Sequence, residues 1–295
     1  MSETPEMVDL IEIDLRSWVE TAAPDPTLYR DRKVTEIVLT AIGRSDRLSA
    51  SLFLKGGTLM ALGFDSLRQT TDVDFTAMAD PEGFDAIVTE DLNRLMPSTA
   101  IQLGHLDLVC RVQSVKKMPR PQNFADQNYP ALRVKIASAL RNTPEVQRLE
   151  AGQAPRVLEV EISFKDDVQT AQTLQLSAAG VTLQAFSFHE LVAEKLRALL
   201  QQPHRNRHRR QDVYDIAFLL DHRDIGPEDL AAIHAALVEK CLIRGIHPTG
   251  DTFDDPEIRR RAEVDWQTLK LEVENLPDFD PTFEAVRGLY VTLPW

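Results

Sequence analysis

The chain has 295 residues, of which 43% are hydrophobic and 27% are charged, and its formal net charge is −13. This composition is typical of a globular protein and excludes an intrinsically disordered chain, and the length suffices for one large domain or two ordinary ones. The negative charge also argues against nonspecific binding of nucleic acid over the whole surface.

The sequence lacks the marks of a membrane or secreted protein. No apolar run approaches the roughly 18–20 residues that span a bilayer. The acidic N-terminus has no basic stretch followed by an apolar one, so no secretory signal is expected. Cys110 and Cys241 have neither CxxC spacing nor a second pair, which argues against a disulfide framework or a thiolate zinc site. We therefore expect a cytoplasmic protein with no membrane partner.

The first 50 residues predict two helices. Apolar residues recur near helical spacing over residues 7–20, until Pro24 and Pro26 interrupt the pattern. Residues 31–54 predict a second helix, a turn near residues 43–45 and then a strand.

The middle of the chain predicts one helix and then several strands. The helix covers residues 80–98 and is expected to end at Pro97. The β-like segments are residues 101–108, 108–115, 131–140, 156–164 and 180–186. In residues 156–164, acidic and apolar side chains alternate, which indicates a strand with one buried face.

The pattern becomes helical at Ser187, which is followed three residues later by Glu190 in a capping-box arrangement. Further helices are expected at residues 213–220, 227–241 and 256–276. This change predicts a boundary near residue 186, with a core domain of residues 1–186 and a helical domain of residues 187–295.

The segment "TDVDF" places two acids two residues apart. In a strand, Asp72 and Asp74 lie on one face, roughly 7 Å apart at Cβ. Carboxylates so arranged can hold Mg²⁺, as one ion or as a pair about 3.5–4 Å apart. The alternative is a solvated face of an edge strand.

A glycine pair lies 14 or more residues before these acids. Gly56 and Gly57 end a predicted strand, and Thr58 opens a short helix. Glycines let the backbone approach a ligand, and the first amides of a helix attract phosphate oxygens. The alternative is a tight turn. Together with the acids, however, this pattern predicts a site for a nucleoside triphosphate and Mg²⁺.

Four blocks within residues 53–220 point to a known family. They are "KGGTLMALGF…LRQTTDVDF", "LEVEISF", "FHELVAEKLRALLQ" and "RHRRQDVYDIAFLL". Their order and spacing resemble the AbiEii/AbiGii abortive-infection nucleotidyltransferase toxins, including the MenT-type tRNA-modifying toxins. The resemblance implies an α+β fold: a DNA-polymerase-β-like nucleotidyltransferase core, which is a mixed sheet flanked by helices, with a helical C-terminal half.

The same resemblance implies an activity and partners. An acceptor hydroxyl would attack the α-phosphate of an NTP in the presence of Mg²⁺ or Mn²⁺, and pyrophosphate would leave. The acceptor would be the 3′ end of tRNA, and a winged helix-turn-helix antitoxin would be the partner. The alternatives are transfer to a protein or small molecule, and a module that binds an NTP without consuming it.

The fold implied by the resemblance also calls for a third carboxylate on a neighbouring strand. Glu159 and Glu161 share a face there, and analogy favours Glu161 as metal ligand or base. Arg68 would clamp a phosphate or form an ion pair with one of the two aspartates. Lys55, beside the glycines, is assigned to the nucleotide site, where Gly57, Thr58 and Lys195 would grip the β- and γ-phosphates.

Charged residues on the apolar faces of the later helices need partners. Lys195 lies within an apolar arc, so it must contact a triphosphate or form a salt bridge that joins its helix to the sheet. Asp212 and Asp215 raise the same question. The family uses an acid of this block in its active site, and we favour Asp212, although it could instead cap the helix.

A short basic segment interrupts the acidic chain. It contains Arg205, Arg207, Arg209 and Arg210. The segment is either a solvated loop or the place where a tRNA acceptor stem docks.

Overall fold

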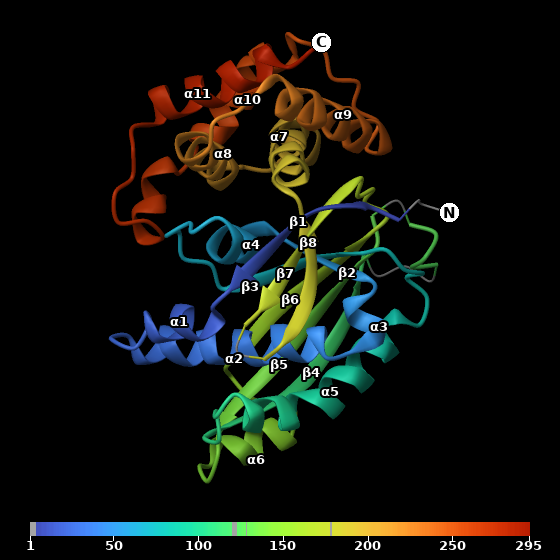
Figure 1. Cartoon of the computed structure of the whole chain (residues 1–295), viewed down its shortest axis with the longest axis vertical. Coiled ribbons are helices and arrows are strands. Elements are labelled where there is room, and N and C mark those ends of the chain that lie inside the picture. Colours follow the sequence, from blue (N-terminus) through green and yellow to red (C-terminus); the bar gives the residue numbers. More distant parts are fainter. Residues whose placement is uncertain (1–3, 120–122, 128, 178) are drawn as a thin grey trace.

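The structure, a computed structural model, describes residues 4–119, 123–127, 129–177 and 179–295. Its strands are β1 (Glu6–Ile13), β2 (Leu52–Lys55), β3 (Asp72–Ala77), β4 (Leu108–Met118), β5 (Ala131–Leu140), β6 (Val157–Phe164), β7 (Thr170–Leu176) and β8 (Val181–Phe186). They form one mixed sheet in the order β1-β7-β8-β2-β3-β6-β5-β4 (Figure 1).

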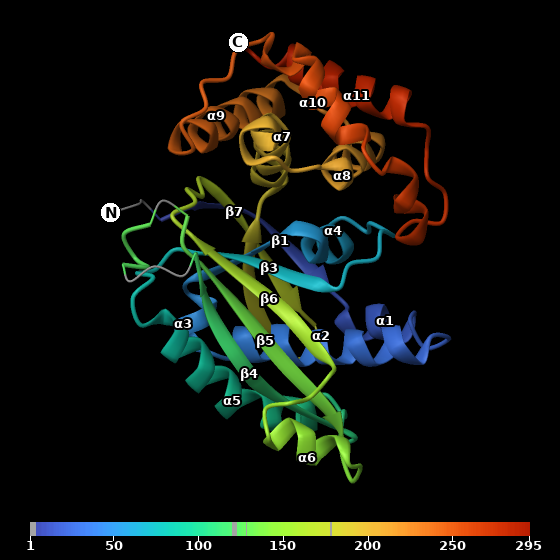
Figure 2. The same ribbon diagram turned by 180° about the vertical axis from the view of Figure 1, so that it is seen from behind.

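Helices cover both sides of this sheet. The helices are α1 (Leu15–Glu20), α2 (Pro26–Gly43), α3 (Asp46–Ser49), α4 (Gly56–Gly63), α5 (Phe84–Gln102), α6 (Glu145–Glu150), α7 (Phe188–Arg205), α8 (Arg210–His222), α9 (Pro227–Ile243), α10 (Pro256–Glu263) and α11 (Phe279–Thr292), with 3₁₀ turns η1 (Thr252–Asp254) and η2 (Trp266–Leu271). Seen from the front and from behind, α7–α11 gather on one side of the sheet, whereas α2 and α5 lie on the other (Figures 1 and 2). Helix α6 packs through Leu149 against Ala137 and Ala139 of β5. The predicted mixed sheet flanked by helices is therefore confirmed.

The helix predicted over residues 7–20 is wrong in its first half. Residues 6–13 form β1, which pairs in parallel with β7 at an edge of the sheet, and only α1 is helical. The apolar side chains of this segment fit a helix or a strand equally well, and pairing with β7 selects the strand. Asp14 separates the two elements, because its carboxylate accepts a hydrogen bond from the Ser17 amide at 2.9 Å and caps α1.

Pro97 does not end its helix, contrary to the sequence prediction. Helix α5 continues to Gln102, so the strand predicted at residues 101–108 is also wrong. Buried side chains lie on both sides of the proline, among them Leu92, Met96 and Ala100. Their packing holds the two halves of the helix on the core despite the one main-chain hydrogen bond that proline removes.

Most of the other predicted elements are confirmed, but four helices or strands were missed. They are α3, α6, β7 and α11, and the helix predicted over residues 256–276 divides into α10 and η2. The strands predicted from residues 108, 131, 156 and 180 are present as β4, β5, β6 and β8. The hydrophobic core continues across residue 186, so the division into two domains remains a prediction.

The hydrophobic core includes one face of β3 and extends into α7–α11. Along β3, Val73 and Phe75 are buried, whereas Asp72 and Asp74 point to the other face. The alternation predicted from the sequence therefore turns the acids toward the C-terminal helices. None of the described helices has the length and apolar character needed to cross a membrane.

Only half of the predicted capping box at the start of α7 forms. The Ser187 hydroxyl accepts a hydrogen bond from the Glu190 amide at 3.2 Å. The Glu190 carboxylate instead accepts one from the Gln169 amide at 2.8 Å and lies 2.6 Å from the Lys240 ammonium. This acid therefore ties α7 to β7 and α9.

Replacing Ser187 with alanine should lower the free energy of unfolding by about 1 kcal/mol, because the Glu190 amide loses its acceptor. Chemical denaturation measures this change. Ser177 is exposed and serves as a control, and Ser177→Ala should change the free energy by less than about 0.5 kcal/mol. Equal losses in the two variants would exclude a capping role for Ser187.

Candidate active site

Strand register gathers acidic side chains on one face of the sheet. Strand β3 runs parallel to β6, which sets Asp72 opposite Glu159 and Asp74 opposite Glu161. It runs antiparallel to β2, which sets Lys55 opposite Asp74. Directly paired residues project to the same face, so four carboxylates and one ammonium group share a small area.

Gly56 and Gly57 must be glycines because β3, the strand that carries the acids, and the residues before it pass close to them. Gly56 has φ of +70°, and a methyl group there would overlap the Asp74 carboxylate. A methyl group on Gly57 would lie 2.8 Å from Thr70 Oγ1 and 3.1 Å from Arg68 Nη2. Asp74 therefore lies directly against the N-terminus of α4.

In the part of the chain that the structure describes, no side chain caps the N-terminus of α4. Its first amides thus keep the capacity to bind phosphate oxygens that the sequence prediction gave them. The Thr58 hydroxyl donates to the Asp72 carbonyl at 2.8 Å, so it fixes the start of β3. Phosphate binding by Gly57 and Thr58 remains a prediction.

Burial and crowding raise the pKa values of both aspartates. Burial, with the nearby charge of Glu159, raises the pKa of Asp72. Burial raises the pKa of Asp74 to about 6; Lys55 and Lys195 oppose this rise, whereas Glu161 and Asp72 add to it. Carboxylates destabilised by one another are stabilised by a cation placed between them. Mg²⁺ fits this pair, since it binds through one or two carboxylates and keeps water and phosphate ligands.

Glu161 is less closely tied to this pair. Its side chain is 53% exposed, and its carboxylate lies 3.9 Å from Arg133. Glu159 is held by Arg133 at 3.4 Å and Lys135 at 3.3 Å. Among the residues described, no group of three or more His, Cys, Asp or Glu side chains is close enough to hold a metal ion. The choice between Glu159 and Glu161 as third acid remains a prediction.

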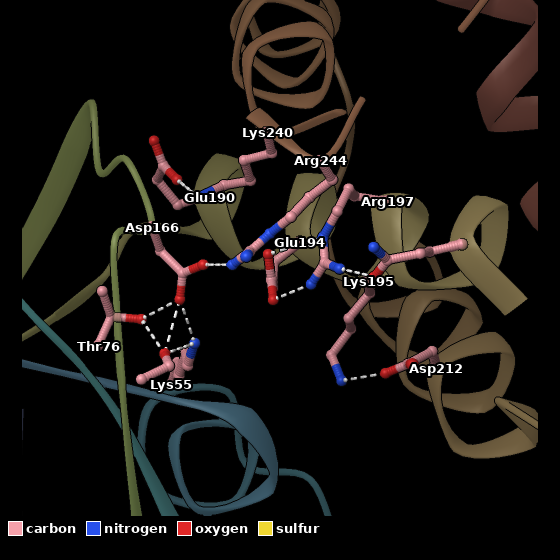
Figure 3. Close-up of polar contacts among 12 residues, drawn as sticks. Lys55, Thr76, Asp166, Glu190, Glu194, Lys195, Arg197, Asp212, Lys240 and Arg244 are labelled. Atoms are coloured by element: carbon pink, nitrogen blue, oxygen red, sulfur yellow. Dashed lines mark hydrogen bonds and ion pairs between the residues drawn. The ribbon is translucent and has the colours of Figure 1, made fainter. Parts of the chain in front are cut away.

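Lys195 lies between two acids of α8. Its ammonium is 3.2 Å from Asp212 (Figure 3). It also lies 2.6 Å from Asp215. Burial works against the charge, but the two acids raise the pKa of Lys195. The salt bridge expected to join α7 to the sheet instead joins α7 to α8. Asp212 lies in the first turn of α8, after the cap residue Arg209, so the alternative of a capping role is wrong.

Arg68 forms neither of the ion pairs expected with Asp72 or Asp74. Its guanidinium binds both carboxylate oxygens of Asp215, at 2.8 and 2.9 Å, and contacts Glu272 at 3.0 Å. Asp215 is thus fully buried between two cations, whereas Asp212 keeps 14% of its side chain exposed. The choice of Asp212 as the acid of the site remains a prediction. A phosphate contact by Arg68 remains a prediction.

A second charged cluster was missed by the sequence prediction. The Asp166 carboxylate accepts hydrogen bonds from Lys55 at 3.0 Å and Thr76 at 3.0 Å, and it pairs with Arg244 (Figure 3). Next to it, Glu194 pairs with Arg197. Asp166 follows β6 and belongs to no periodic sequence pattern. Its position just after a strand that carries acids is the one sequence signal that could have indicated a role in the site.

The predicted basic loop is partly helical. Arg205 ends α7, Arg207 is exposed, and Arg209 and Arg210 are half-buried at the start of α8. Partial burial and the surrounding arginines, Arg197 and Arg207 first among them, lower the pKa of Arg205. A cation whose neighbours are cations lies in a positive potential, which is suited to an anionic partner.

These features define the class of the protein. A mixed sheet with paired acids beside a glycine-rich helix start is the architecture of a nucleotidyltransferase. MenT4, a nucleotidyltransferase toxin from Mycobacterium tuberculosis H37Rv, shares 17% identity with a TM-score of 0.56 over 94% of this chain and 88% of its own. JHP933 from Helicobacter pylori shares 16% identity with a TM-score of 0.52 over 90% of each chain. At these identities the similarity establishes the fold.

The family follows from the sequence match. The model of the nucleotidyl transferase AbiEii toxin family, from type IV toxin–antitoxin systems, matches residues 39–287. The chain therefore belongs to this family and is a nucleotidyltransferase, as its four sequence blocks predicted. No curated protein sequence matches the chain significantly.

Gly56→Ala should be more damaging than Gly83→Ala. Both glycines have positive φ, +70° and +76°, so each variant incurs a similar backbone cost of about 1–2 kcal/mol. Only Gly56 faces the Asp74 carboxylate; a methyl group on Gly83 meets no atom within 4 Å. We expect Gly56→Ala alone to lose nucleotidyl transfer, measured by turnover together with chemical denaturation. Equal turnover in the two variants would contradict this geometry.

Asp215→Asn should lower the free energy of unfolding by about 3 kcal/mol, because Arg68 and Lys195 would be left buried with less negative charge. Asp212→Asn should cost less, since Asp212 is partly exposed and Lys195 keeps Asp215. Urea denaturation of the two variants tests this order. A larger loss for Asp212→Asn would show that the ion pairs are assigned incorrectly.

Proposed function

We propose that this toxin transfers a nucleoside monophosphate from an NTP to the 3′ end of tRNA, with Mg²⁺ held by Asp72 and Asp74. Mn²⁺ would serve in its place. The observation that supports this most strongly is the position of Asp74, which lies against the uncapped start of α4 and within the field of Lys195. A metal ligand, phosphate-binding amides and a cation for the triphosphate are thus close together.

The residues of the site divide the work of binding and orientation. Asp72 and Asp74 hold the metal, and the amides of Gly57 and Thr58 take phosphate oxygens. Lys195 contacts the β- and γ-phosphates, held in place by Asp212 and Asp215. Lys55 and Gly56 border the nucleotide, and Arg68 supports Asp215 from the other side. The bound metal neutralises charge on the phosphates; the rest of the catalysis is positioning.

The chemical step is an in-line displacement at the α-phosphorus. The acceptor oxygen forms a bond to phosphorus as the bond to the pyrophosphate oxygen breaks, and pyrophosphate leaves with the bonding electrons. The proton of the acceptor hydroxyl goes to Glu161 acting as base, or to water when Glu161 serves as the third metal ligand. The half-exposed Glu161 side chain is suited to either role.

The acceptor would enter beside the basic residues Arg205, Arg207, Arg209 and Arg210. These span the junction of α7, which provides Lys195, with α8, which provides Asp212. An RNA end docked there would meet the site between a core domain of residues 1–186 and a helical domain of residues 187–295. A local cluster of arginines of this kind is compatible with a chain whose net charge is −13.

Membership of a toxin family also supports a partner. We propose a cognate antitoxin with a winged helix-turn-helix, and action in the cytoplasm, where tRNA is available.

Asp72→Ala should abolish NTP-dependent labelling of RNA while leaving the protein folded, because the metal loses one of its two fixed ligands. The measurement is incubation with radiolabelled NTPs and Mg²⁺, followed by separation of RNA, protein and small molecules. Asp9→Ala, at an exposed acid of β1, is the matched control and should label RNA at the wild-type rate. If Asp72→Ala labels RNA at the wild-type rate, the metal assignment is wrong. If the label appears in protein or in small molecules, the acceptor is one of these and not tRNA.

A further inference from the structure

We propose that Asp166 is a positioning residue that keeps the Lys55 ammonium away from Asp74, so that the Asp74 carboxylate stays open to the metal. This inference rests on the proposed metal site at Asp72 and Asp74. It assigns a role to a buried acid that neither the sequence pattern nor the proposed chemistry explains.

Lys55 is the cation best placed to block Asp74. The two residues are direct partners in the antiparallel pairing of β2 and β3, so their Cβ atoms are about 4.5–5.5 Å apart on the same face. A four-carbon side chain reaches a carboxylate over that distance. Yet no ion pair within 4.0 Å joins them in the described part of the chain.

Asp166 holds Lys55 elsewhere. The Lys55 ammonium lies 3.0 Å from Asp166 Oδ2 and 2.7 Å from Ser163 Oγ. The Ser163 hydroxyl lies 2.6 Å from the same Asp166 oxygen and Thr76 lies 3.0 Å from it (Figure 3). The acid keeps only 6% of its side chain exposed. A buried carboxylate with several hydrogen bonds is a strong and rigid partner for an ammonium group.

The charge balance around Lys55 explains why Asp166 must be charged. Arg244 also binds Asp166, from the C-terminal end of α9, and Arg197 is occupied by Glu194 on α7. Without the negative charge of Asp166, Lys55 and Arg244 would both lack their acid. The nearest carboxylate on the strand opposite Lys55 is Asp74, and a carboxylate paired with ammonium is a poorer ligand for a metal.

The test measures Mn²⁺ binding, by the electron paramagnetic resonance signal of free Mn²⁺, in the full-length protein. Asp166→Asn should weaken Mn²⁺ binding about tenfold, the effect typical of a residue that orients a ligand. Lys55→Met alone removes the competing ammonium and serves as the reference for the double variant. Lys55→Met/Asp166→Asn should bind Mn²⁺ within about twofold of Lys55→Met, and more tightly than Asp166→Asn, because the ammonium that Asp166 restrains is gone.

The rescue separates positioning from a purely structural role. If Asp166→Asn binds Mn²⁺ as tightly as the wild type, or if the double variant stays as weak as Asp166→Asn, the inference is overturned. If Asp166→Asn does not fold, Ser163→Ala takes its place, since it removes a hydrogen bond from both Lys55 and Asp166 without removing charge. It should weaken Mn²⁺ binding a few-fold, and Lys55→Met should restore it; failure of either effect rejects the inference.

The same titration tells this inference apart from the proposed function. Asp74→Asn should lose Mn²⁺ binding in every background. If the wild type fails to bind Mn²⁺, or Asp74→Asn binds it unchanged, the metal site itself is wrong. If those two results are as expected and only the Asp166 variants disagree, the metal site stands and the role of Asp166 does not.

Discussion

The structure depends on the placement of a buried carboxylate, Asp74, against the backbone of a helix start. Asp74 lies so close to Gly56 that no side chain fits there, and burial with neighbouring acids raises its pKa to about 6. Such a carboxylate is unfavourable unless a cation joins it. We interpret the residues around Asp74 as parts of the proposed site, which a metal ion and a triphosphate would complete.

The surrounding ion pairs hold this arrangement together across the two halves of the chain. Asp215 binds Arg68 and Lys195, and so connects the segment before β3 with α7 and α8. Asp166 binds Lys55 and Arg244, and so connects β2 with the end of α9. Buried pairs of this kind contribute less to stability than to a defined geometry, which is what a site with two like-charged ligands needs.

Local chemistry and strand alternation allowed much of the site to be predicted from the sequence. The alternation around Asp72 and Asp74 fixed their common face, and Gly56 was predicted as a place of close approach. The structure shows Asp74 close to Gly56, and the approach of a nucleotide to this glycine stays a prediction. The order of four sequence blocks identified the family, which the match over residues 39–287 confirms.

Long-range partners could not be predicted. Arg68 and Asp215 are 147 residues apart, and Lys55 and Asp166 are 111 apart, so only the sheet register and helix packing reveal these pairs.

The most direct test of the central claim is anomalous diffraction from crystals with Mn²⁺ and a non-hydrolysable NTP analogue. We predict a Mn²⁺ peak shared by Asp72 and Asp74, with the triphosphate at the start of α4. A peak at other residues, or a triphosphate bound away from α4, would contradict it.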